Sequence, residues 1–242
     1  MPPFVRTLFE AVLGLFVVAV AWEVAALLID NPTRLPLLTV VLRKALALAP
    51  SDDYLRHVTD SATALLLGLP PALAAGVLVG ALAGRSPGMR LLIGPIAVAL
   101  AAAPLIALLP VFVAWWGLTM TTKVVTIFVV ALFPTLNAVM AAIAARHHRA
   151  RLVAQRTLLA QPSGAASPAC AIVASLRLGV VLGVTALIVS EFVASSRGVG
   201  YFIMSSANML DTTAMMAGIV LVVVPTVLVA AFLQAIEEQL AQ

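Results

Sequence analysis

Six long apolar runs dominate the chain, and shorter polar segments separate them. A membrane-spanning helix needs roughly 20 apolar residues, and a helix satisfies its own backbone polar groups where no water is present. The pattern therefore predicts an all-α, polytopic membrane protein with a single transmembrane domain over residues 1–242. We expect its six transmembrane helices at about 11–29, 61–84, 91–116, 124–145, 171–191 and 212–236.

Two segments depart from this simple pattern. The third run carries Pro95, Pro104 and Pro110 before the step Trp115-Trp116-Gly117, and it is longer than one straight helix requires. Because proline kinks a helix, we expect a broken span that ends near Gly117. Residues 39–48, between the first two spans, predict a short amphipathic helix at the membrane surface.

Composition excludes a water-soluble domain. The chain is 63% hydrophobic and only 10% charged, with a mean hydropathy of +1.14. The net charge of +4 lies in segments beside the spans, where lipid headgroups and topology explain it better than nucleic acid. The single cysteine, Cys170, cannot form an internal disulfide.

The distribution of basic residues predicts the orientation. The longest polar interruption, residues 146–170, begins with a dense group of arginines, and cytoplasmic loops are the ones enriched in Lys and Arg. This predicts a multi-pass protein of the bacterial inner membrane with both termini in the cytoplasm. The inner side then holds Arg6, Arg85, Arg90, Arg146, Arg149, Arg151 and Arg156, and the outer side holds Arg34, Arg43, Lys44, Arg56, Lys123 and Arg197.

Four polar residues at or inside the spans are candidates for a transport pathway: Glu23, Asn137, Arg177 and Glu191. Each also has a structural interpretation. Glu191 can sit at the outer boundary, Glu23 can pair within the bundle, and Arg177 can anchor the inner end of the fifth span. Glycines 76, 80 and 84 are spaced by four and predict close helix packing, either within the subunit or between two subunits.

Catalytic patterns are absent from the sequence. No phosphate-binding glycine loop with its lysine occurs, and no nucleophile elbow surrounds Ser190. His147-His148 point about 100° apart on a helix, with no third metal ligand near them in the sequence. We therefore expect a protein that is not an enzyme and that binds no cofactor or metal itself.

Several stretches, in this order and spacing, resemble the permease subunit of binding-protein-dependent ABC importers, in the branch for nitrate, sulfonate and taurine. They are Trp22-Glu23, 80–95 (GALAGRSPGMRLLIGP), 104–117 (PLIALLPVFVAWWG), 123–137 (KVVTIFVVALFPTLN) and 175–201 (SLRLGVVLGVTALIVSEFVASSRGVGY). The resemblance covers nearly the whole chain. It implies import of a small, anionic solute, driven by a separate ATPase subunit that holds ATP and Mg. It also implies a second permease subunit, identical or related, and an external substrate-binding protein.

In that family the loop between the fourth and fifth spans docks on the ATPase through a signature that begins Glu-Ala-Ala and contains a later glycine. Here the matching positions are Val153, Ala154, Gln155 and Leu159, so the signature is degenerate, and the loop is shorter. Leu152, Gln155 and Leu159 still fall on one side of a helix. The residues expected to dock are Arg149, Leu152, Val153, Ala154, Gln155, Arg156 and Leu159.

Two other interpretations stay open. The lost signature is also what a degenerate, non-transporting half of a heterodimeric permease would show. A stand-alone secondary carrier or channel would need ionisable groups inside the membrane, and the chain offers mainly Glu23, with Glu191 at an edge.

Overall fold

The computed structural model describes residues 3–155 and 168–240. These ranges are almost entirely helical and contain no strand, which confirms the all-α prediction. The elements are α1 (Pro3–Ile29), α2 (Leu38–Leu48), α3 (Asp52–Arg85), α4 (Pro87–Ala102), the 3₁₀ helix η1 (Leu105–Leu108), α5 (Leu109–Trp116), α6 (Met120–Gln155), α7 (Pro168–Val193), α8 (Val199–Asn208) and α9 (Thr212–Leu240).

The described helices supply five to six membrane spans. Five of them, α1, α3, α6, α7 and α9, are long and apolar enough to cross a bilayer one by one. The sixth span is the pair formed by α4 and the segment Leu105–Trp116, which is bent by 81°. The bend falls at Ala103-Pro104, one of the prolines in the third apolar run, as expected for a broken span.

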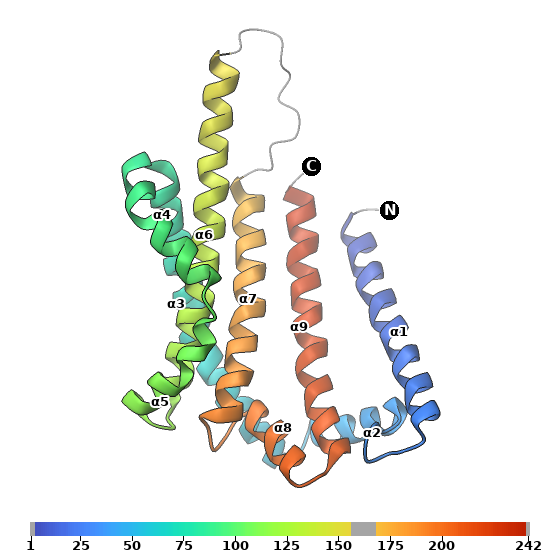
Figure 1. Ribbon diagram of the computed structural model, residues 1–242. Helices are drawn as coiled ribbons and strands as arrows, with labels where there is room; N and C mark the ends of the chain where they lie inside the picture. The colour runs from blue at the N-terminus through green and yellow to red at the C-terminus, as the bar shows by residue number, and fades with distance from the viewer. Residues whose placement is uncertain (1–2, 156–167, 241–242) are drawn as a thin grey trace.

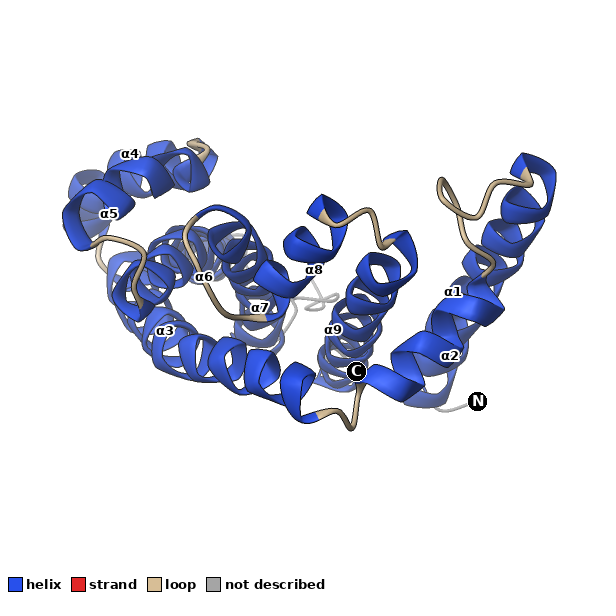
Figure 2. Cartoon of the chain, turned by 90° about the horizontal axis from the view of Figure 1, so that it is seen from below, coloured by secondary structure: helices blue, strands red, loops and turns tan. Residues whose placement is uncertain are grey.

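Both termini lie at the same end of the molecule as the exit from α6 and the entry into α7 (Figure 1). We call this the connector end. The opposite end holds α2, α8 and the last turns of α5, and we call it the α8 end (Figure 1). Seen along the helices, α6, α7 and α9 form a row, with α4 and α5 at one flank and α1 at the other (Figure 2).

Three element boundaries differ from the sequence analysis. The second span extends back to Asp52, so its helix includes polar residues ahead of the apolar run. The fourth span begins at Met120 and continues through Gln155, so residues 146–155 prolong the membrane helix instead of starting a separate loop. Beyond the fifth span, the chain forms the short helix α8, which the apolar pattern did not predict.

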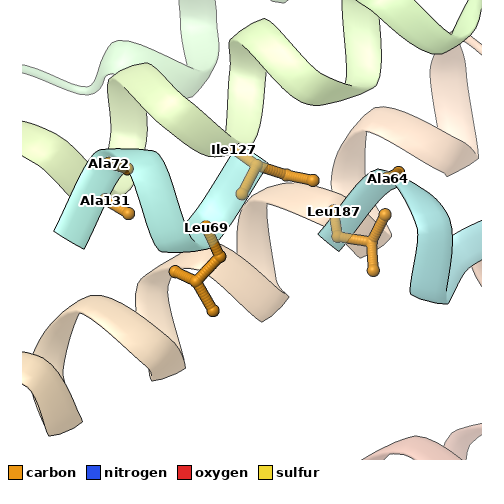
Figure 3. Packing of buried hydrophobic residues seen from close by; sticks show 6 residues of the cluster. All are labelled: Ala64, Leu69, Ala72, Ile127, Ala131 and Leu187. Atoms are coloured by element: carbon orange, nitrogen blue, oxygen red, sulfur yellow. The ribbon is translucent and has the colours of Figure 1, made fainter. Parts of the chain in front are cut away.

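A seam of small residues joins α3 to α6. A Cβ atom added to Gly80 would lie 2.6 Å from the Leu136 carbonyl oxygen, and one added to Gly84 would lie 2.8 Å from the Ile143 Cβ. Gly76 meets α6 in the same way, so the three glycines pack within the subunit. Alanines continue the seam beside larger residues in the buried cluster Ala64, Leu69, Ala72, Ile127, Ala131 and Leu187 (Figure 3).

Candidate functional site

A carboxylate, that of Glu191, is enclosed within the fold near the end of α7. Its side chain is fully buried. Ser61 Oγ on α3 lies 2.7 and 2.9 Å from the two carboxylate oxygens, and the Gly200 backbone N–H donates to Oε2 at 2.8 Å. Lys123 Nζ on α6 lies 3.3 Å from Oε1. Three donors from three other elements therefore converge on this carboxylate.

Lys123 is the cation of the same cluster, and only 3% of the residue is exposed. Its ammonium group donates to Asp60 on α3, to Glu191, and to the Arg197 carbonyl oxygen at 2.7 Å. A lysine has three protons to donate, and all three have an acceptor here. A buried ion pair is tolerated only with such complete hydrogen bonding. We call Asp60, Ser61, Lys123 and Glu191 the lock, because it ties α3, α6 and α7 together.

The turn between α7 and α8 is shaped to fit the lock. Gly198 has a φ of 123°, in the left-handed region, and a Cβ there would collide with the Glu191 carboxylate. Its backbone N–H donates to Nδ1 of His57 on α3 at 3.1 Å. The next N–H, that of Val199, donates to Ser61 Oγ at 2.8 Å. The lock thus also fixes the start of α8.

Sequence reasoning identified Glu191 but missed its partners. It treated Lys123 as an outer-loop charge, whereas the structure buries this residue one turn into α6. Asp60 and Ser61 stand at the beginning of the second apolar run, where a polar residue carries no special meaning. The usable signal was a single lysine directly before one apolar run and a single glutamate at the end of another.

Glu23, a predicted pathway residue, caps a helix. Its carboxylate accepts the backbone N–H of Leu38 at 2.6 Å and contacts Thr39 Oγ1 at 3.2 Å. These groups open α2, whose own N-cap residue Leu37 provides no side-chain cap. The neighbouring Trp22 donates its indole N–H to the Pro36 carbonyl at 3.0 Å. Glu23 and Trp22 therefore fix the connection between α1 and α2.

Arg177 lies on α7 toward the connector end. Its guanidinium is 3.2 Å from a carboxylate oxygen of Glu237 on α9 and 3.5 Å from the amide oxygen of Gln234. The two charged side chains are 36% and 24% exposed, so this pair is much more open to its surroundings than the lock.

Asn137 lies in the middle of α6, three residues after Pro134. It is half-buried, and its side chain has no hydrogen-bond partner within the described ranges. Of the four predicted pathway residues, it is the one whose polar group the fold leaves available.

Only some of the predicted docking residues lie in the part of the chain that the structure describes. Arg149, Leu152, Val153, Ala154 and Gln155 lie in the last turns of α6, whereas Arg156 and Leu159 lie outside the described residues. The 36 residues of α6 give a helix of about 54 Å, well over the roughly 30 Å of a bilayer's hydrocarbon core. Figure 1 shows α6 extending beyond the neighbouring helices at the connector end.

Among the described residues, no group of three or more His, Cys, Asp or Glu side chains is placed to hold a metal ion. The fold and the polar clusters together define a polytopic helical membrane protein with a broken third span, a buried ionic cluster at one end and a basic helical extension at the other.

Comparison with known proteins relates the chain to transport permeases. No protein-family model matches the chain. The chain is 28% identical over 236 residues to the taurine transport system permease protein TauC of Escherichia coli (strain K12), covering 90% of this chain and 83% of that protein. It is 29% identical over 231 residues to the putative aliphatic sulfonates transport permease protein SsuC of Bacillus subtilis (strain 168), covering 93% and 83%.

A third relative is the formylaminopyrimidine transport permease protein ThiX of Halalkalibacterium halodurans, 26% identical over 198 residues, with 80% of this chain and 79% of that protein covered. These relatives confirm the resemblance to permease subunits of ABC importers. They are transport permeases and not enzymes.

Proposed function

We propose that the chain is the permease subunit of an importer that carries a small sulfonate-type solute across the bacterial inner membrane. Two of its relatives carry taurine and aliphatic sulfonates in their names, and each aligns over at least 90% of this chain. The broken third span and the six-span arrangement support the same function. The observation that carries the proposal furthest is the extension of α6, which gives an external motor a rigid element to push.

The motor is a separate ATPase subunit that holds ATP and Mg. It docks on residues 146–155 and on the connector that follows. The extension is continuous with a membrane span, so a displacement of its tip is transmitted directly into α6. This offsets the degenerate signature of the loop, because coupling requires a stiff link more than a particular sequence.

The connector end faces the cytoplasm in this proposal. It gathers both termini, the basic extension of α6, and the turn at Arg85 between α3 and α4. An excess of Lys and Arg on one side is the usual mark of the cytoplasmic face. The α8 end then faces outward, where a binding protein delivers the solute.

A second permease subunit, identical or related, completes the pathway. ATP binding then shifts the pair between inward-open and outward-open arrangements, which requires the nucleotide-bound ATPase to favour one of them. Bending is easiest where the fold already interrupts a helix, at Pro104 in the third span, and where it carries proline, at Pro134 and Pro225.

The proposal is tested with Leu152→Asp on the α6 extension. We expect the variant to insert and fold normally but to lose most ATP-driven taurine uptake in proteoliposomes that hold the purified complex. The matched control is Leu152→Met, which keeps an apolar side chain of similar volume at the same position and should leave uptake close to wild type.

Unchanged uptake by Leu152→Asp would contradict docking on the extension. Taurine transport by the purified chain without any ATPase would instead identify a stand-alone carrier. In a cysteine-free Cys170→Ser background, Leu152→Cys should also crosslink to a nucleotide-hydrolysing protein in native membranes.

A further inference from the structure

An open, polar pocket of about 500 Å³ lies at the α8 end and shares Asp60 with the lock. Six of its seven lining residues are polar or charged. They come from the first turns of α3 and from the turn between α7 and α8 (Figure 1): Asp52, Leu55, Arg56, Thr59, Asp60, Thr63 and Arg197. The α3 members recur mainly at spacings of three and four, so they share one face of that helix. We call this the arginine pocket.

The two arginines are the unpaired cations of the arginine pocket. Arg56 and Arg197 are both exposed, and within the described ranges neither guanidinium has a hydrogen bond or an ion pair. Asp60, by contrast, is neutralised by Lys123 of the lock. Asp52 stands in the first turn of α3, where the helix dipole favours a negative charge. The pocket therefore presents two free cations beside one carboxylate that its own helix stabilises.

The threonine hydroxyls of the pocket are already committed to their own helix. Thr59 donates its proton to the Leu55 carbonyl and Thr63 donates to the Thr59 carbonyl, both at 2.7 Å. The guanidinium N–H groups are thus the free side-chain donors among the lining residues. A guanidinium carries five donors in a planar fork that matches a carboxylate. The chemistry of the pocket fits carboxylate groups.

Hydrogen bonds at the backbone hold the two arginines in place relative to each other. His57, which follows Arg56, accepts the backbone N–H of Gly198 at 3.1 Å. Gly198 in turn follows Arg197, whose carbonyl accepts from Lys123 at 2.7 Å. Because both backbones are anchored, less conformational freedom is lost when a partner binds, and such preorganisation increases affinity.

The features of the pocket favour a protein partner over a small ligand. Small-molecule sites are mostly apolar and enclose most of the ligand. Here the walls are polar and both arginines are exposed. Arginine is enriched in protein–protein interfaces, where its fork pairs with carboxylates. In the proposed function the α8 end faces outward, so the partner that reaches this pocket is the external binding protein.

We propose that Arg56 and Arg197 form a docking site for acidic side chains of the external binding protein. The inference rests on the proposed function, and it goes beyond it by naming the surface and the charge that receive this partner. Arg197 and Asp60 both accept from Lys123. A displacement of Arg197 on docking therefore reaches the helices that the lock joins.

The test measures the affinity of the intact complex for its binding protein. The permease–ATPase complex is placed in nanodiscs, and the purified, taurine-loaded binding protein of the same importer is titrated against it. We expect Arg56→Glu and Arg197→Glu each to raise the Kd about tenfold at low salt, since a repulsive contact replaces an attractive one. The effect should shrink at about 0.5 M salt, because ions screen exposed charges.

Arg43→Glu is the matched control. Arg43 is also exposed at the α8 end, on α2, but it does not line the arginine pocket. The same charge reversal there should change the Kd less than about twofold. Arg197→Lys keeps the positive charge and should bind more tightly than Arg197→Glu. The unfolding free energy of every variant should match wild type, because exposed side chains of this kind contribute little to stability.

An unchanged Kd for both pocket variants, or an equal change for Arg43→Glu, would overturn the docking site while ATP-driven uptake by the wild-type complex stays intact. If the pocket variants keep the wild-type Kd but lose a stabilisation that phosphatidylglycerol nanodiscs give wild type, the pocket binds lipid headgroups, and the proposal is also overturned. If the wild-type complex in proteoliposomes takes up no taurine with ATP and binding protein present, the proposed function itself fails, and this inference fails with it.

Discussion

Each end of the molecule contains an ionic contact between helices, and the two contacts differ in burial. At the α8 end, Lys123 and Glu191 are almost completely buried and every donor of the lysine is used. At the connector end, Arg177 and Glu237 pair with side chains that are 36% and 24% exposed. The first arrangement fixes several helices in one geometry, whereas the second yields at little cost. The connector end, on which the proposed ATPase acts, is thus the end with the weaker ion pair.

Of the substitutions considered, Lys123→Met should reduce the difference in stability between the two ends the most. The substitution leaves Glu191 and Asp60 without their cation, and removal of one partner of a buried pair costs about 3–5 kcal/mol. The measurement is the free energy of unfolding by SDS of the detergent-solubilised protein. A cost below about 1 kcal/mol would show that the lock does not stabilise the α8 end.

Gly80→Ala tests the seam that connects the two ends. The added Cβ would meet the Leu136 carbonyl oxygen, and overpacking of this kind costs about 1–3 kcal/mol. Gly14→Ala is the control, because a Cβ there meets no atom within 4 Å, and alanine favours a helix. Equal unfolding free energies for the two variants would contradict the close contact of α3 with α6.

Glu23→Ala sharpens the comparison within the α8 end. The loss of the side-chain oxygen that accepts the Leu38 N–H should cost about 1 kcal/mol, as for other helix caps. Hydrogen exchange at the first amides of α2 should accelerate. Thr39→Val, which removes only the contact at 3.2 Å, should change this exchange less; an effect as large as that of Glu23→Ala would assign the cap to the wrong group.

Glu237→Gln should have the smallest effect. A partly exposed ion pair contributes about 0–1 kcal/mol, and salt screens it. We expect an unfolding free energy within about 1 kcal/mol of wild type, with the difference shrinking at high ionic strength. A loss as large as that of Lys123→Met would mean that both ends are equally rigid.

The spans and the break were predictable because their signals are local. An apolar run of sufficient length, or a proline at position 104, is read directly from neighbouring residues. The partners in the lock were not predictable, because Ser61 and Glu191 are 130 residues apart and Lys123 and Asp60 are 63 apart. A count of basic residues also assumes that each charge is solvated, and Lys123 violates that assumption.

The glycine seam shows what a correct sequence pattern predicts and what it leaves undetermined. The spacing of Gly76, Gly80 and Gly84 predicted close packing, but a face lined by small residues does not specify which helix will cover it. Only the fold shows that α6 takes this position. Asn137 illustrates the opposite case, since its availability follows from the contacts it does not make within the described ranges.

The continuity of α6 connects the two ends of the molecule through one helix. About 48 Å of uninterrupted helix separates Lys123 from Gln155, and the Lys123 end is held in place by the ionic cluster. Pro134 lies near the middle of this helix, and a cavity of about 210 Å³ lies against it. A displacement of the helix end at Gln155 that bends α6 at Pro134 would therefore change the shape of this cavity.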